Sequence, residues 1–143
     1  MTTTWIVAAD SSRARILQVT DREKALAEID DLLNPEGRVD DRQLTTDAHA
    51  RFHGSGGGSA PGSDREETSA AEHATELFAK RVGEYLDKAR TAHKYDRLHL
   101  VAPPRFLGQL RKELGKEVQK LVTDELPKDL SWLKPRDLQE RLR

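Results

Sequence analysis

Two short apolar runs separated by turn residues open the chain. Thr4 to Ala9 is apolar and contains β-branched residues, residues 10–12 are Asp-Ser-Ser, and Ala14 to Val19 is largely apolar again. β-branched residues favour strands, and Asp and Ser favour turns. The pattern therefore predicts a β-hairpin at the start of the chain.

A third strand and a long polar stretch follow the predicted hairpin. Ala27 to Leu33 can form a strand with Ile29 and Leu33 on one face. The proline and glycine of residues 34–37 end this strand, because both residues interrupt regular structure. Arg38 to His53 is polar and only weakly periodic, which favours an extended loop.

A glycine-rich tract precedes the longest predicted helix. Gly54 to Ser63 (GSGGGSAPGS) cannot bury enough apolar area to offset backbone ordering, so we expect a flexible Gly/Ser-rich loop. Ser69 and Glu72 fit a capping box, so the helix is expected to begin there. Apolar residues then recur every three or four positions, as in an amphipathic helix: Ala74, Leu77, Phe78, Val82, Tyr85, Leu86 and Ala89.

The last third of the chain alternates predicted strands and helices. Residues 96–102 (DRLHLVA) are typical of a central strand, and a helix is expected to begin at Pro104 or Arg105 and to end at Gly115. Residues 116–126 fit a helix by apolar spacing and a strand by the triplet Leu-Val-Thr. Pro135 begins a short terminal helix.

This order of elements predicts an α/β fold. A single domain over residues 1–143 is expected, in which an antiparallel β-meander is followed by βαβ crossovers. The result is a mixed β-sheet flanked by helices. The ribonuclease H-like and release-factor middle-domain topologies share this order.

Composition and charge restrict the kinds of function. The net charge is -1, with 7 Lys+Arg against 10 Asp+Glu up to His53 and 12 against 8 from His93, which is a weak basic bias for nucleic-acid binding. The absence of cysteine excludes disulfides, thiolate zinc sites and cysteine nucleophiles. No apolar run reaches the roughly 20 residues of a membrane span and no signal-like start is present, so we expect a cytoplasmic protein without membrane insertion.

Four stretches carry a resemblance to a known family. They are WIVAADSSRARI at 5–16, NPEGRVDDRQLTTD at 34–47, YDRLHLVAPPRFLGQLRKEL at 95–114 and ELPKDLSW at 125–132. Over nearly its whole length the chain resembles the bacterial host attachment protein family, whose members are described as required for attachment to host cells. The resemblance implies a role in attachment.

That family is in turn distantly similar to the middle domain of archaeal and eukaryotic class-1 peptide release factors. This similarity implies the mixed-sheet fold. In release factors a GGQ loop lies between an early strand and the long helix, and residues 54–63 occupy that interval here without a glutamine. The resemblance therefore gives no basis for peptidyl-tRNA hydrolysis.

Three residues are candidates for metal binding. Asp10 follows the first strand, where ribonuclease H-like nucleases place a metal-binding aspartate, so a two-metal site with Glu72 or Glu76 is one interpretation. The favoured alternative is a turn residue that accepts hydrogen bonds from its own backbone. His49 and His53 are four residues apart and could share a divalent metal on a helix, although solvated histidines are favoured in an extended segment.

Three arginines are candidates for partner contacts. Arg38 and Arg42 could pin their loop by pairing with nearby aspartates, or present their guanidinium groups to an RNA phosphate or a partner carboxylate. Arg105 at a helix start is a further candidate contact. No cofactor is expected, because glycines 54–58 lie far from the predicted helix start and no Lys-Ser or Lys-Thr pair follows them.

The leading interpretation is a non-enzymatic cytoplasmic interaction protein that affects attachment indirectly through an unknown protein partner, with no catalytic residue assigned. One alternative is a ribosome- or RNA-associated factor, and another is a metal-dependent nuclease or hydrolase. Exposed sheet edges could also pair two copies of the chain as a homodimer.

Overall fold

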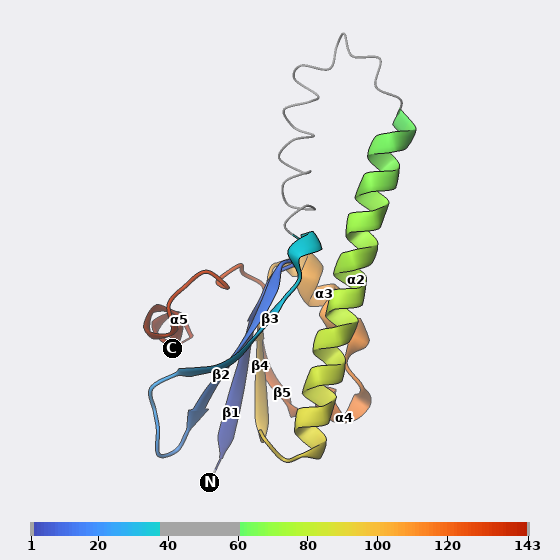
Figure 1. Cartoon of the computed structure of the whole chain (residues 1–143). Coiled ribbons are helices and arrows are strands. Elements are labelled where there is room, and N and C mark those ends of the chain that lie inside the picture. The colour runs from blue at the N-terminus through green and yellow to red at the C-terminus, as the bar shows by residue number, and fades with distance from the viewer. Residues whose placement is uncertain (1, 38–60, 143) are drawn as a thin grey trace.

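Five strands form one mixed β-sheet in the computed structural model, which describes residues 2–37 and 61–142 (Figure 1). β1 (Thr3–Ala9), β2 (Arg13–Thr20) and β3 (Ala27–Leu33) form an antiparallel meander. β4 (Arg97–Val101) pairs in parallel with β1, and β5 (Val122–Leu126) pairs in parallel with β4. The order β3-β2-β1-β4-β5 confirms the predicted α/β fold with a meander followed by βαβ crossovers.

Helices cover both faces of the sheet. α2 (Pro61–Thr91), α3 (Pro104–Glu113) and α4 (Lys116–Leu121) lie on one face, and α5 (Pro135–Arg141) lies on the other (Figure 1). We call residues 127–142, which include α5, the C-terminal segment. None of the helices in the described ranges is long and apolar enough to cross a membrane.

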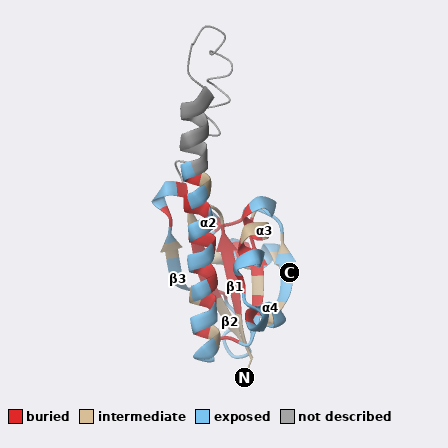
Figure 2. Cartoon of the chain, turned by 90° about the vertical axis from the view of Figure 1, so that its right-hand side faces the viewer, coloured by how far each residue is buried: buried red, intermediate tan, exposed pale blue. Residues whose placement is uncertain are grey.

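Each face of the sheet carries its own apolar core, because strand residues alternate between faces. On the α2 side the sheet packs against α2, α3 and α4, and the fully buried members include Val7, Ile16, Val82, Leu86, Leu98, Leu100, Leu110 and Val118. Figure 2 shows the buried stripe of α2 beside its exposed face. On the opposite face a smaller core joins the sheet to the C-terminal segment through Ile6, Ala8, Leu17, Val101, Leu130, Leu133 and Leu138.

Three aromatic residues join β1 to α2 and to the turn before β4. The Trp5 ring lies 6.1 Å from the Tyr85 ring and 5.0 Å from the Tyr95 ring, measured between centroids. The buried Tyr95 hydroxyl donates to the carbonyl of Leu86 at 2.7 Å, and burial raises the pKa of Tyr95 to about 12. The Asp30 carboxylate accepts from the Tyr85 hydroxyl, which lowers the pKa of Asp30.

The predicted start of the long helix is wrong. α2 begins at Pro61, so residues 61–63 of the predicted glycine-rich loop are helical and Ser69 lies inside the helix. Proline is favourable in a first helical turn, so Pro61 is compatible with this earlier start. The rest of the predicted loop lies outside the described residues.

Other expectations need smaller corrections. Leu77 was placed on the buried stripe of α2 but is 53% exposed, while Ala71 and Thr75 are buried in its place. Ile29 and Leu33 are exposed, as is nearly all of β3, which is an edge strand of the sheet. For residues 116–126 the sequence allowed a helix or a strand. The structure contains both, first the helix α4 and then the strand β5.

Candidate functional site on the C-terminal segment

Asp10 organises the turn between β1 and β2. One carboxylate oxygen accepts hydrogen bonds from the Ser12 amide at 2.8 Å, the Ser12 hydroxyl at 2.8 Å and the Arg13 amide at 2.9 Å. Aspartate commonly bonds to the backbone two residues on in this way. The interpretation of Asp10 as a turn residue is thus confirmed.

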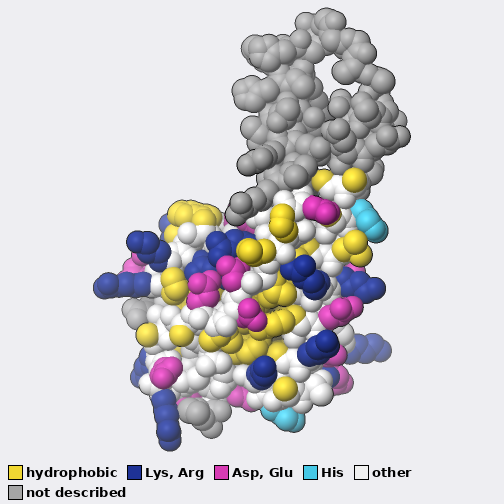
Figure 3. Space-filling view, viewed as in Figure 1, with side chains coloured by type: hydrophobic (Ala, Val, Ile, Leu, Met, Phe, Trp, Pro, Cys, Tyr) yellow, Lys and Arg dark blue, Asp and Glu magenta, His cyan; other side chains and the backbone are white. Residues whose placement is uncertain are grey.

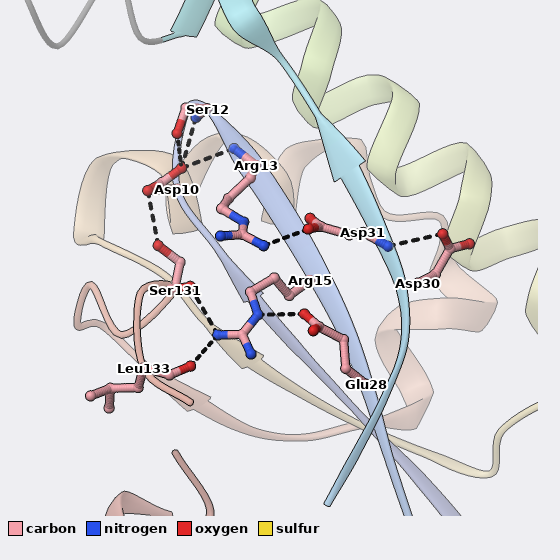
Figure 4. A network of polar contacts seen from close by, with 9 residues as sticks. All are labelled: Asp10, Ser12, Arg13, Arg15, Glu28, Asp30, Asp31, Ser131 and Leu133. Atoms are coloured by element: carbon pink, nitrogen blue, oxygen red, sulfur yellow. Dashed lines mark hydrogen bonds and ion pairs between the residues drawn. The ribbon is translucent and has the colours of Figure 1, made fainter. Parts of the chain in front are cut away.

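The other oxygen of Asp10 reaches the C-terminal segment. Ser131, which is almost fully buried, places its hydroxyl oxygen 2.9 Å from Asp10 Oδ2 and also 2.9 Å from Asp129 Oδ1. A serine hydroxyl carries a single proton, so it donates to one of the two carboxylates at a time. Ser131 therefore ties the turn after β1 to the C-terminal segment (Figure 4).

Arg15 makes the second connection between the sheet and this segment. Its side chain projects from β2 and is only 4% exposed. Nη1 donates to the carbonyl of Ser131 at 3.0 Å and to the carbonyl of Leu133, while Nε donates to Glu28 on β3 at 2.5 Å (Figure 4). A buried guanidinium needs such partners, because desolvating an unpaired charge is costly.

A third connection holds α5. The side-chain amide of Gln139 accepts from the Leu26 amide at 3.1 Å and donates to the carbonyl of Lys24. Both partners lie in the connection between β2 and β3. Arg15, Ser131 and Gln139 thus tie the C-terminal segment to the sheet, to the turn after β1 and to the connection between β2 and β3.

Trp132 stands out from this fixed segment. Its neighbours Ser131 and Leu133 are buried, whereas Trp132 is 69% exposed. The indole Nε1 donates to the carbonyl of Asp129 at 3.0 Å, which restrains the ring. A large aromatic side chain exposed on a rigid base is typical of residues that anchor a binding partner.

Basic residues and a groove accompany Trp132. Lys128, Lys134 and Arg136 are exposed, and in the part of the chain that the structure describes none of them forms an ion pair. Lys134 and Arg136 also line a groove of about 620 Å³, whose other lining residues are Ala25, Leu26, Pro135, Gln139 and Glu140. We call Lys128, Trp132, Lys134 and Arg136 the Trp132 surface.

The residues predicted as sites are only partly covered by the structure. Arg38, Arg42, His49 and His53 lie outside the described residues. Arg105 lies in the first turn of α3, which begins at Pro104, and pairs with Glu72 of α2 at 2.8 Å. Both side chains are about half exposed, so the pair is held on the surface.

In the described residues, Asp10 forms no metal-binding group with Glu72 or Glu76 of α2. Glu72, one imagined partner in a two-metal site, faces Arg105. Over residues 2–37 and 61–142 no group of three or more His, Asp or Glu side chains is arranged to hold a metal ion. Both oxygens of Asp10 lie within hydrogen-bond distance of donors from the chain itself.

Two further pockets are lined by side chains that bind each other. One of about 400 Å³ lies beside β5, where Arg111 makes a two-pronged contact with Glu125 that raises the pKa of Arg111. Another of about 340 Å³ lies between residues 34–36 and α2. There Arg81 donates to the carbonyl of Leu33 at 2.6 Å and lies over the Phe78 ring.

Sequence reasoning missed Arg15, Ser131 and Trp132 as members of a site. One signal was available: Arg15 interrupts an apolar run in a predicted strand between Ala14 and Ile16. A charged residue in a buried strand requires a partner. The sequence does not indicate that this partner is the backbone of residues 131 and 133.

Comparison with known proteins places the chain beside a family and a relative. The model of a family described as "Protein required for attachment to host cells" matches residues 5–142. An uncharacterised protein of Rickettsia prowazekii (strain Madrid E) is 43% identical over 54 residues. That match covers 36% of this chain and 36% of the relative, so the chain spans about a third of the relative that it matches.

Proposed function

Because the chain belongs to the family of proteins required for attachment to host cells, we propose that it is a non-enzymatic cytoplasmic binding protein that acts on attachment indirectly. The observation that carries this proposal is the exposed Trp132 on a segment fixed by Arg15. Binding surfaces gain affinity when the anchoring residue needs no further ordering. The Trp132 surface is the proposed contact.

The polar network around Asp10 supports a binding role over a hydrolytic one. Its hydrogen bonds serve the turn and the C-terminal segment, so the Asp10 carboxylate is engaged in holding structure. The absence of cysteine from all 143 residues is in keeping with a reducing compartment, where disulfides are rare.

Affinity purification from the native cytoplasmic extract tests this proposal. The full chain, Trp132→Ala and Leu77→Ala would be compared, because Leu77 is also a large exposed apolar residue but lies on α2. We expect the wild type and Leu77→Ala to retain the same partner and Trp132→Ala to lose it. The circular dichroism spectrum of each variant serves as the control for folding.

Two results would contradict the proposed function. One is a Trp132→Ala variant that keeps every partner of the wild type. The other is magnesium-dependent cleavage of RNA by the purified protein that disappears in Asp10→Ala, because this would make the chain a hydrolase.

A further inference from the structure

We propose that the Trp132 surface binds a short stretch of single-stranded nucleic acid, with one base stacked on the Trp132 ring and phosphates contacted by Lys128, Lys134 and Arg136. This inference rests on the proposed binding function and names the chemistry of the partner. Figure 3 shows Lys and Arg side chains interspersed with Asp and Glu on the left side of the molecule, where Figure 1 draws the C-terminal segment.

The Trp132 ring is suited to stacking. Its N–H is already donated to the Asp129 carbonyl, so a partner gains little by supplying an acceptor to the indole. What the ring offers is its exposed aromatic surface. Every base has a π face, and stacking on an aromatic side chain stabilises single-stranded nucleic acid without regard to sequence.

The cations of this surface are available for phosphates. Arg13, Arg105 and Arg111 each pair with a carboxylate elsewhere on the protein. Within the described ranges, Lys128, Lys134 and Arg136 have no such pair. Lysine and arginine contacts with phosphates supply most of the sequence-independent affinity for nucleic acid.

The neighbouring groove gives the strand a path past Trp132. Lys134 and Arg136 line the groove, and Lys134 is two residues from Trp132, so their Cα atoms are at most about 7.6 Å apart. A volume of about 620 Å³ lies within the range of small-ligand sites. The short distance between Trp132 and Lys134 allows one base to stack on the ring while the next nucleotide lies in the groove.

The composition of the surface argues against a membrane as its partner. The other large exposed apolar residues are Ile29 and Leu33 on β3 and Leu77 on α2. On the C-terminal segment, as far as it is described, no other large apolar side chain is exposed. Its exposed charged residues are the cations Lys128, Lys134, Arg136 and Arg141 and the carboxylates Asp129, Asp137 and Glu140. An amphipathic membrane anchor presents a whole apolar face beside its aromatic residues.

The test is fluorescence anisotropy of labelled 12-nucleotide probes, oligo(U) and oligo(dT), with the full chain at 50 to 200 mM salt. Three phosphate contacts predict a slope of log K against log salt of about -2. Trp132→Ala should weaken binding by about 5- to 100-fold, and Trp132→Phe should weaken it less, because a phenyl ring still stacks. The two probes distinguish RNA from DNA as the source of the strand.

Matched variants separate the two contributions. The double variant Lys134→Gln/Arg136→Gln should reduce the slope of log K against log salt to about -0.7, while Lys116→Gln, which removes an exposed cation on α4, should leave the slope unchanged.

Tryptophan fluorescence gives a second readout. Probe binding should quench the emission of Trp132 and spare that of Trp5, which is 2% exposed. Thermal unfolding of every variant shows that it is folded.

The proposal is overturned if neither probe binds, if Trp132→Ala binds as the wild type does, or if the slope is near zero. It is also overturned if vesicles with anionic lipid or a poly-glutamate peptide bind in a Trp132-dependent manner and the oligonucleotides do not. If the oligonucleotides fail but Trp132→Ala still loses its native partner in the extract, the proposed binding function stands and only this inference falls.

Discussion

Arg15 and Ser131 are 116 residues apart in the sequence, yet Arg15 Nη1 donates to the Ser131 carbonyl at 3.0 Å. The same guanidinium also bonds to Leu133 and to Glu28. The buried arginine thus joins the second strand of the meander, its neighbour β3 and the C-terminal segment. Trp132 lies between the two residues whose carbonyls Arg15 binds.

Replacing Arg15 should strongly destabilise the protein. Arg15→Met leaves the carbonyls of Ser131 and Leu133 without their donor and Glu28 without its cation, so we expect a loss of about 2–4 kcal/mol in the free energy of unfolding. Arg13→Met is the matched control, because Arg13 lies on the same strand and its ion pair with Asp31 is about one third exposed. We expect its loss to stay below about 1 kcal/mol. Equal losses in urea unfolding would contradict the special role of Arg15.

Asp10 should behave as a turn residue. Asp10→Ala removes the acceptor for the Ser12 and Arg13 amides and should cost about 1–3 kcal/mol. Asp10→Asn should cost less, because an amide oxygen can accept from the same turn. Urea unfolding with and without magnesium chloride measures both effects. Magnesium that stabilises the wild type but not Asp10→Asn would show instead that the carboxylate is a metal ligand.

Two glycines in helices should respond to alanine in opposite ways. A Cβ atom on Gly83 of α2 would lie 2.7 Å from the backbone oxygen of Glu113 in α3, so Gly83→Ala should force the helices apart and cost about 1–3 kcal/mol. A Cβ atom on Gly108 of α3 meets nothing within 4 Å, so Gly108→Ala should stabilise the helix by about 0.5–1 kcal/mol. Thermal unfolding compares the two. A harmless Gly83→Ala would mean that α2 and α3 are not in this close contact.

Tyr95 should make the protein sensitive to alkaline pH. Its pKa is raised from an ordinary value near 10 to about 12 in the folded state, because the phenol is buried. The unfolded chain therefore releases this proton first as the pH rises. The contribution of Tyr95 is complete below pH 10 and is lost between about pH 10 and 12.

The corresponding measurement is the free energy of unfolding in urea from pH 8 to 12. We expect the wild type to lose up to about 1.4 kcal/mol per pH unit more than Tyr95→Phe over the upper two units. The variant keeps Tyr85, whose pKa is also raised by burial and by the Asp30 carboxylate, so the difference isolates Tyr95. Parallel curves for the two proteins would contradict the assignment.

The strands could be predicted from the sequence because each lies between clear turn signals. Thr4 to Ala9 and Ala14 to Val19 are apolar runs separated by Asp-Ser-Ser, and their pairing follows from proximity. The start of α2 was predicted too late, because the capping box at Ser69 indicated a helix start and the composition of residues 54–63 indicated a loop. The helix instead begins at Pro61.

The candidate site could be predicted only in part, because its contacts join residues far apart in the chain. The local hydrogen bonds of Asp10 follow from turn chemistry, which depends on residues 10–13 alone. The contact between Asp10 and Ser131 spans 121 residues and depends on how the C-terminal segment crosses the sheet. Trp132 lies inside a stretch that carried the family resemblance, but its exposure depends on the burial of Ser131 and Leu133.

The central claim is that Trp132 is exposed and yet held still by the sheet beneath it. Time-resolved fluorescence anisotropy tests it most directly in a Trp5→Phe background, where Trp132 is the remaining emitter. With Arg15 present, Trp132 should rotate with the whole protein, and Arg15→Met should add a fast local motion on the sub-nanosecond scale. A ring that already moves freely on that scale with Arg15 in place would contradict the claim.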